Sequence, residues 1–249
     1  MPRRVAHEVC APRPTPAMAK CAIFEAMLLR FCILAAVAGT LLGQQAGSEV
    51  WRFDNLDRIG GYPVTVVGHP RVVATPIGKA IAFGGVEDAI YLDVHPLAGA
   101  AAFTWEVIFR PDPGGAPEQR FFHLSVLDPK TGKDTPDRML FEIRVIDSRW
   151  CLDSFALSGT ASKALIDRGK LHSLGAWHHA ALVYDGGRLS NYVDGEMQGS
   201  AEVRLAPQGP GHCSIGVRID RRDYFKGAVF EARMTRRALS TAEFLRVPE

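Results

Sequence analysis

The sequence predicts an all-β protein whose strands form an antiparallel sandwich or barrel. From about residue 49 to residue 248, short runs rich in β-branched and aromatic residues are separated by Gly, Pro, Asp and Asn. Only one brief helical pattern is present, near the C-terminus. Short strands joined by turns are typical of antiparallel architectures. No repeat, low-complexity block or linker divides this region, so we expect a single domain.

Several segments carry the strand pattern. They are residues 80–83, 89–94, 103–109, 119–127, 139–146, 150–157, 178–184, 188–193 and 225–234. The clearest alternation lies in residues 139–146, where apolar Phe141 and Ile143 fall on one face and Glu142 and Arg144 on the other. Such a pattern predicts a strand with one face on the core. A long polar loop is expected before it, over residues 128–137.

Turn and cap residues mark the ends of the later elements. The Asp-Gly-Gly turn at residues 185–187 separates two strand patterns, and glycine accepts the positive φ that tight hairpins need. Residues 239–244 read as the start of a short helix, because Ser240 and Glu243 have the spacing of a capping box. We therefore expect a hairpin around the turn and a short C-terminal helix.

The N-terminal part has the features of an export signal. Residues 31–42 form an uncharged apolar run behind Arg30, and small residues follow from 43 to 48. The run is shorter than the roughly 20 residues of a membrane-spanning helix and matches a signal-peptide core. We expect residues 27–46 to be a cleaved signal peptide and residues 47–249 to be a secreted, extracytoplasmic domain. An uncleaved membrane anchor is the alternative.

Residues 1–26 lack a hydrophobic pattern and are rich in Pro, Arg and Ala. Met18 and Met27 are both candidate starts, and a start at Met27 gives a signal peptide of ordinary proportions. We expect residues 1–26 to be either disordered or untranslated.

The charge balance argues against a nucleic-acid-binding protein. The formal net charge is +2, and no basic stripe runs along the chain. Basic residues outnumber acidic ones in the leader, so the mature domain is close to neutral. We expect no nucleic-acid partner and, once the signal peptide is cleaved, no stable membrane span.

Cys151 and Cys213 are the cysteines of the predicted mature domain. In an oxidising compartment they could form a disulfide, which requires Cα atoms less than about 7 Å apart. The other interpretation is two buried free thiols that pack as small apolar side chains. Neither cysteine belongs to a C-x-x-C pair, which argues against a structural zinc site.

Family motifs appear in the last third of the chain. They are AWHHAALVYDGG at residues 176–187, NYVDG at 191–195, FKGAV at 225–229 and RRALSTAE at 236–243. These motifs resemble those of laminin-G-like domains in the concanavalin A-like lectin/glucanase superfamily. The resemblance is specific over about residues 176–245 and looser at residues 51–54 and 103–107.

The resemblance implies a concanavalin A-like jelly-roll sandwich of two antiparallel sheets. Trp177 is large enough to fill the core of such a sandwich. His178 and His179 are adjacent, so a strand would point them to opposite faces, one buried and the other toward solvent. His172 and His212 show no metal-ligand spacing.

The same superfamily contains β-glucanases, so acidic residues must be considered as catalysts. Retaining hydrolysis needs two carboxyl groups about 5–5.5 Å apart. The stretch most similar to the glucanase motif holds Glu142 and Asp147, but Arg144 stands where that motif has an acid. Glu142 and Asp147 are an odd number of residues apart, so a regular strand would place them on opposite faces. An ion pair of Glu142 with Arg144 is the simpler interpretation; Glu106 and Asp153 are further acids to test.

Many laminin-G-like domains hold a structural calcium ion. Phe230 stands where the family often has Asp, and residues 83–85 contain no acid, which removes oxygen ligands that calcium prefers. Asp54 is the remaining candidate ligand. We expect no cofactor, with calcium at Asp54 as the alternative.

Residues 216–224 are denser in charge than their surroundings. Aromatic faces and charged hydrogen-bonding groups suit a sugar or an acidic glycan, which makes Arg144, Trp150, Arg222 and Tyr224 candidate ligand-binding residues. A solvated loop of mixed charge is the alternative.

These observations predict a secreted, non-catalytic recognition or scaffold domain whose partner is a carbohydrate or an extracellular protein. Two alternatives remain. One is a glycan-active hydrolase of the glucanase-like branch, with Glu142 and Asp147 as its catalytic residues. The other is a structural envelope protein without a small ligand.

Overall fold

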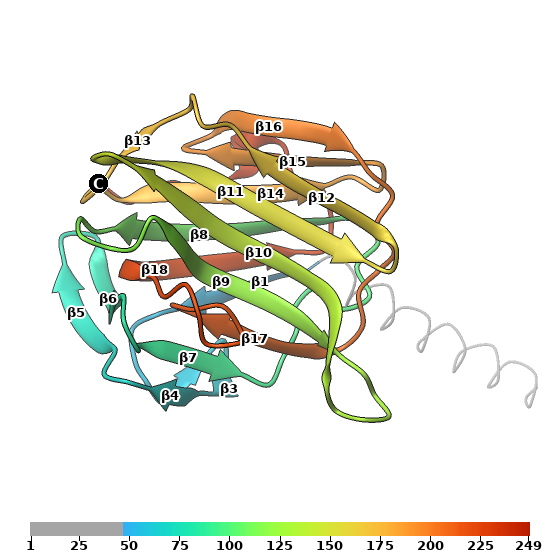
Figure 1. The fold of residues 1–249 in the computed structure, drawn as a ribbon, viewed down its shortest axis with the longest axis horizontal. Helices are drawn as coiled ribbons and strands as arrows, with labels where there is room; N and C mark the ends of the chain where they lie inside the picture. The colour runs from blue at the N-terminus through green and yellow to red at the C-terminus, as the bar shows by residue number, and fades with distance from the viewer. Residues whose placement is uncertain (1–46) are drawn as a thin grey trace, which may run out of the picture. The chain divides into compact units, whose positions relative to one another are not determined.

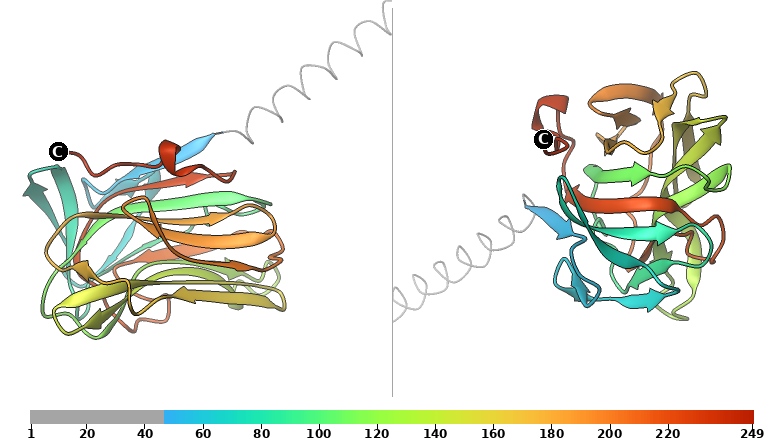
Figure 2. Two further views of the ribbon diagram at one scale, coloured as in Figure 1. Left: turned by 90° about the horizontal axis from the view of Figure 1, so that it is seen from above. Right: turned by 90° about the vertical axis from the view of Figure 1, so that its left-hand side faces the viewer.

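A computed structural model describes residues 47–249, in which regular structure is almost entirely β-strand (Figure 1). Two eight-stranded antiparallel sheets pack face to face and appear as separate layers in Figure 2. The predicted all-β sandwich of two antiparallel sheets is therefore confirmed. The predicted signal peptide and residues 1–26 lie outside the described residues. Within residues 47–249, no helix is long and apolar enough to cross a membrane.

The first sheet, sheet 1, is built around the long strands β8 and β18. Its order is β16-β15-β14-β8-β18-β6-β5, and β1 also pairs with β18. The bounds are β1 (Ser48–Arg52), β5 (Arg71–Thr75), β6 (Gly78–Gly84), β8 (Phe103–Pro111), β14 (His178–Tyr184), β15 (Arg188–Val193), β16 (Glu196–Glu202) and β18 (Lys226–Thr235). The predicted hairpin is β14–β15. Asp185 closes its turn by accepting hydrogen bonds from the N–H groups of Gly187 and Arg188 at 2.9 and 2.8 Å.

The second sheet, sheet 2, has the order β12-β11-β10-β9-β17-β7-β4, and β13 also pairs with β11. The bounds are β4 (Thr65–Val67), β7 (Ala89–Leu92), β9 (Glu118–Leu127), β10 (Asp134–Ile146), β11 (Arg149–Ser158), β12 (Ala161–Ile166), β13 (His172–Ser173) and β17 (Gly211–Ile215). A two-stranded ribbon, β2 (Arg58–Ile59) with β3 (Tyr62–Pro63), lies outside both sheets.

The polar loop predicted over residues 128–137 is shorter in the structure. Backbone pairing of Asp134 with Leu127 extends the β9–β10 ladder over polar residues.

Large aromatic side chains fill the space between the sheets. Trp51, Trp105 and Trp150 are completely buried. The rings of Phe109 and Phe121 stack with centroids 4.1 Å apart. Aromatic burial of this kind supplies much of the hydrophobic stabilisation of a sandwich core.

Trp177 does not belong to this core, so the prediction that it fills the sandwich is wrong. Alternation along β14 points Ala180 and Leu182 inward, which places Trp177 on the outer face of sheet 1. There it packs against Phe230, and the guanidinium carbon of Arg110 lies 5.2 Å from its ring centre.

The C-terminal segment, residues 236–249, runs back over the outer face of sheet 1 (Figure 2). Phe244 packs on Ala181 and Val183 of β14. The predicted C-terminal helix is a single 3-10 turn, η1 (Thr241–Glu243). The predicted capping box is present, since the N–H of Ser240 donates to Glu243 Oε2 at 3.0 Å.

A buried ion cluster lies under this segment. Glu106, with no exposed surface, accepts hydrogen bonds from His179 Nε2 at 3.0 Å, Arg233 Nε at 2.6 Å and the N–H of Leu245 at 2.7 Å. His178 and His179 do point to opposite faces, but neither faces solvent, because the C-terminal segment covers His179.

Cys151 and Cys213 are both free and buried. Cys151 lies on β11 and Cys213 on β17, with β10 and β9 between them in sheet 2. This separation is too large for a disulfide, and the interpretation as free thiols is confirmed.

Candidate functional site

The register of sheet 2 gathers charged residues from three strands on its outer face. Glu142 on β10 is the direct neighbour of Asp153 on β11 and of Arg120 on β9. A β-bulge at this point of β9 leaves Phe121 without a partner residue, so Phe121 and Phe122 both pack in the core while Arg120 points outward. Arg144, two residues along β10 from Glu142, projects from the same face.

These four side chains form the arginine–carboxylate network (Arg120, Glu142, Arg144 and Asp153). Arg144 Nη2 lies 3.0 Å from Glu142 Oε2 and 2.7 Å from Asp153 Oδ2. Arg120 Nη2 lies 3.0 Å from the same oxygen of Glu142. Each side chain is 14% exposed or less. The predicted ion pair of Glu142 with Arg144 is therefore confirmed, although on a crowded face rather than a solvated one.

Burial gives Glu142 an unusual proton affinity. Burial raises the pKa of Glu142 to about 7, because the loss of solvation outweighs the favourable charge of Arg120. The negative charge of the neighbouring Asp153 also raises this pKa. A carboxyl group with this pKa next to a second carboxyl group has the properties of a general acid. The network therefore has one chemical feature of a glycosidase centre.

The other candidate acids lie elsewhere. Asp147 is exposed in the turn between β10 and β11, with a φ of 54°. At about 3.3 Å per residue, it lies some 16 Å along the strand from Glu142. Glu106 is on the other sheet, under the C-terminal segment. The pairing of Glu142 with Asp147 as catalytic residues is thus wrong: the acid beside Glu142 is Asp153.

The predicted ligand-binding residues are brought together in part. Arg120 Nη1 lies 2.6 Å from Asp223 Oδ2, in the charged loop that follows β17. Arg222 and Tyr224 belong to this loop. A chain of ion pairs therefore links Arg144 to Arg222 through Glu142, Arg120 and Asp223. Arg222 is well exposed, and Tyr224 is half-buried.

Trp150 is a correction to the predicted binding set. Its side chain is completely buried in the core, and its Nε1 donates to the carbonyl of Ser173 at 3.0 Å. Alternation along β11 points Trp150 inward and Phe155 outward.

An apolar patch adjoins the network on the outer face. Phe155 of β11 is half-buried, and the guanidinium carbon of Arg138 lies 4.7 Å from its ring centre. Leu140 of β10 is the direct cross-strand neighbour of Phe155. The outer face of sheet 2 therefore offers an aromatic side chain next to charged donors and acceptors in fixed positions. The sequence pattern did not predict Phe155 as a binding residue.

Asp54 is exposed, and its Oδ1 accepts a hydrogen bond from the side chain of Asn55 at 2.8 Å. Among residues 47–249 it belongs to no group of three or more His, Cys, Asp or Glu side chains that could share a metal ion.

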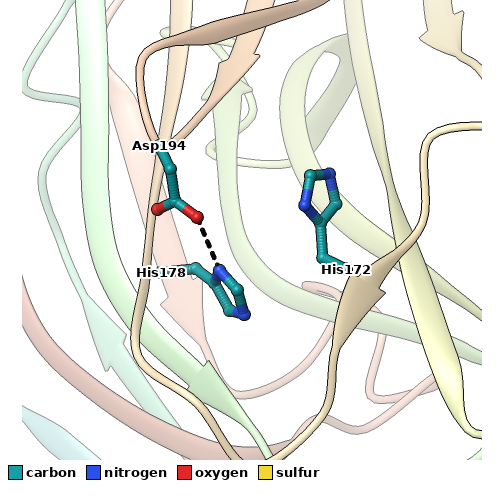
Figure 3. Close-up of side chains that lie close together, drawn as sticks. All are labelled: His172, His178 and Asp194. Carbon is teal, nitrogen blue, oxygen red and sulfur yellow. Dashed lines mark hydrogen bonds and ion pairs between the residues drawn. The ribbon is translucent and has the colours of Figure 1, made fainter.

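Three residues do form such a group: His172, His178 and Asp194, each of which offers one ligand atom within 4.8 Å of the others (Figure 3). His172 begins β13, His178 begins β14, and Asp194 follows β15. Burial lowers the pKa of His172, which favours the neutral form of this ring. Burial alone would raise the pKa of Asp194, but hydrogen bonds from His178 and from the N–H of His179 outweigh it and lower that pKa. No spacing pattern in the sequence predicted this group of three residues.

Comparison with known proteins identifies the fold. A family model described as the concanavalin A-like lectin/glucanases superfamily matches residues 83–244. No curated protein matches the chain in sequence.

Several solved structures share this architecture. Domain 4 of AbnA, a GH43 extracellular arabinanase from Geobacillus stearothermophilus, in complex with arabinotriose, is 19% identical, with a TM-score of 0.59 over 80% of this chain and 97% of that one. The binding domain of Paraclostridial Mosquitocidal Protein 1 is 13% identical, with a TM-score of 0.55 over 79% of this chain and 50% of that one. Trypanosoma rangeli sialidase in complex with sialic acid is 17% identical, with a TM-score of 0.56 over 78% and 31%. At these identities the likeness shows the fold alone.

Proposed function

Because this chain belongs to the concanavalin A-like lectin/glucanase superfamily, we propose that it is a secreted, non-catalytic domain that binds carbohydrate through the outer face of sheet 2. The observation that carries the proposal is the arginine–carboxylate network beside Phe155. Sugars present hydroxyl groups at their edges and apolar C–H groups on their faces. The network and Phe155 offer matching partners for both.

The network holds its polar groups in fixed positions. Arg144 and Arg120 each bind a carboxylate of a neighbouring strand, so their side chains need little further ordering when a ligand arrives. Charge-assisted hydrogen bonds to sugar hydroxyls are stronger than neutral ones. Arg222, well exposed at the end of the adjoining loop, extends the same surface.

The similar structures support the same class of ligand. The arabinanase domain is described in complex with arabinotriose, and the sialidase in complex with sialic acid. The binding domain of Botulinum Neurotoxin DC, 9% identical with a TM-score of 0.54 over 79% of this chain and 49% of that one, is described in complex with SialylT.

A glycan hydrolase is the second candidate, and the pKa of Glu142 favours it. Arg144 Nη2 lies 3.0 Å from Glu142 Oε2 and 2.7 Å from Asp153 Oδ2, so these two oxygens are no more than about 5.7 Å apart, close to the separation of a retaining pair. The position of Arg144 argues against it, because its Nη2 donates to both carboxylates and lies where the sugar would have to bind. Release of reducing sugar from β-glucans or arabinan, abolished by Glu142→Gln, would establish the hydrolase instead.

A glycan array that includes arabinotriose and sialic-acid-terminated glycans tests the proposal. We expect selective binding that Phe155→Ala and Arg144→Lys each weaken at least tenfold. The control is Arg188→Lys, because Arg188 forms an exposed ion pair with Glu202 on the other sheet. Equal binding by the unmodified protein and all three variants would overturn the proposal, as would no binding by the unmodified protein. Either result would leave a protein partner as the better assignment.

Two further parts of the proposal have direct tests. Binding is expected to survive a chelator of calcium, since no cofactor is needed by the side chains involved. N-terminal sequencing of exported protein is expected to find a start between residues 44 and 48, whereas retention of residues 27–43 would support the uncleaved anchor.

A further inference from the structure

His178 and Asp194 present two facing acceptors that need a cation between them. Nε2 of His178 lies 3.0 Å from the carbonyl oxygen of Ser173, and a carbonyl only accepts, so Nε2 carries a hydrogen. In the neutral ring Nδ1 is then a lone pair, 2.7 Å from Asp194 Oδ2. At 2.7 Å the two atoms share a proton. A metal ion that replaces this proton would bind the same two lone pairs after the atoms move apart to about 3.3 Å.

His172 is arranged in the same way. Its Nε2 lies 3.0 Å from Gln198 Oε1, and the amide of Gln198 is oriented by its own hydrogen bond to the carbonyl of Glu196 at 2.9 Å. Nε2 of His172 therefore donates, and its other ring nitrogen keeps a lone pair. That nitrogen points toward His178 and Asp194 (Figure 3).

We propose that His172, His178 and Asp194 bind a divalent transition-metal ion, with Zn²⁺ as the best fit. Two imidazole nitrogens and one carboxylate oxygen, with water in a fourth position, are a recurrent zinc ligand set, whereas calcium prefers oxygen ligands alone. Metal-binding histidines typically donate their second N–H to a carbonyl or carboxylate, as both histidines do here.

The surroundings of the three residues support this assignment. The second oxygen of Asp194 accepts the N–H of His179 at 2.8 Å, which orients the carboxylate. Trp150 lies against both rings, with centroid distances of 4.9 Å to His172 and 5.2 Å to His178, and excludes water on that side. The Asp194 side chain is 45% exposed, so an ion can enter from solvent.

The geometry requires a small adjustment. Zinc–ligand bonds of about 2.0–2.1 Å in a tetrahedron separate neighbouring ligand atoms by about 3.3 Å. The ligand atoms of His178 and Asp194 are now 2.7 Å apart and must separate by about 0.6 Å, whereas other pairs span up to 4.8 Å and must come closer. His172 lies on a two-residue strand, and a shift of its side chain by up to about 1.5 Å closes the site. None of the three residues belongs to the arginine–carboxylate network, so this proposal stands independently of the carbohydrate proposal.

Calorimetric titration of the protein with ZnCl₂ tests the site, with Co²⁺ absorption in the visible range as a second readout. We expect one Zn²⁺ per chain, and at least a tenfold loss of affinity in both His172→Asn and Asp194→Asn. His69→Ala is the matched control, because His69 lies outside the group, and its affinity should equal that of the unmodified protein.

Absence of Zn²⁺ binding by the unmodified protein, or unchanged affinity in the two Asn variants, would overturn the proposal. Should His172→Asn fail to fold, Asp194→Asn carries the test alone. Asp194 has a φ of 51°, which asparagine adopts readily, and the asparagine amide oxygen still accepts the N–H of His179.

Discussion

Glu142 and Asp153 are direct neighbours across β10 and β11, and one guanidinium nitrogen of Arg144 donates to both carboxylates. The two arginines also form ion pairs with Glu118 and Asp223 at the edge of this group, on the outer face of sheet 2. Removing one partner of such a group leaves a charge without compensation in a poorly solvated position, which costs about 3–5 kcal/mol in buried pairs. The network is therefore sensitive both to substitution and to pH.

Glu142 should make the protein less stable as pH rises toward neutrality. Its pKa is raised from 4.5 to about 7 in the folded state, so between these values the folded chain holds a proton that the unfolded chain releases. The stabilising contribution of this proton is fully present below the pKa that Glu142 has in the unfolded chain. It is lost as pH rises through the pKa of Glu142 in the folded chain, and the total loss is roughly 3 kcal/mol. Urea unfolding between pH 4.5 and 8 measures this decline. Glu142→Gln should flatten it, and an identical decline in the variant would contradict the prediction.

Glu106 should be essential for holding the C-terminal segment on sheet 1. Glu106→Ala leaves Arg233 and the N–H of Leu245 without their shared acceptor, and we expect a loss of about 3–5 kcal/mol in the free energy of unfolding. Limited proteolysis should then cut after residue 236 faster than in the unmodified protein. Glu202→Ala, which removes an exposed ion pair with Arg188, should cost less than about 1 kcal/mol.

Gly227 should tolerate no side chain. Its φ is 154°, and a Cβ atom there would lie 2.1 Å from the carbonyl oxygen of Arg110 and 2.5 Å from the ring of Phe225. Gly227→Ala must therefore displace β8 or Phe225, at a cost of at least about 2 kcal/mol. Thermal unfolding measures the effect, with Gly187→Ala as the control, since its nearest neighbour is a side-chain oxygen 3.8 Å away. Similar melting temperatures for the two variants would disagree with this account.

Both described thiols should be unreactive in the folded protein. Burial raises the pKa of Cys151 and, more strongly, that of Cys213, so little thiolate forms near pH 8. A thiol reagent followed by peptide mapping should label neither residue natively and both in guanidinium chloride. Native labelling of Cys213 would show that β17 opens on the time scale of the reaction.

Local patterns predicted the long strands well and the edge strands poorly. Strands β8, β9, β11 and β14 were all recognised because apolar and aromatic residues recur along them. Strands β5 and β12 were missed, because both lie at sheet edges where most side chains are exposed and no apolar face develops. Trp177 was misplaced for a related reason, since its size predicts burial but not the side of the sheet.

The hairpin between β10 and β11 defines the partner of Glu142. A tight turn at Asp147 and Ser148 pairs residues symmetrically on either side, which makes Asp153 the neighbour of Glu142. Sequence reasoning compared acids within one strand and therefore chose Asp147 instead of counting across the hairpin.

The sequence by itself determined the all-β class, the family and the alternation that points Glu142 and Arg144 away from the core, because these follow from two-residue periodicity and local motifs. Tertiary structure alone decided that Arg120 of β9 reaches Glu142, that the C-terminal segment buries Glu106, and that His172, His178 and Asp194 meet. Each of these depends on sheet order, the β9 bulge or a loop path. Such features arise from packing between distant segments and leave no periodic trace in the chain.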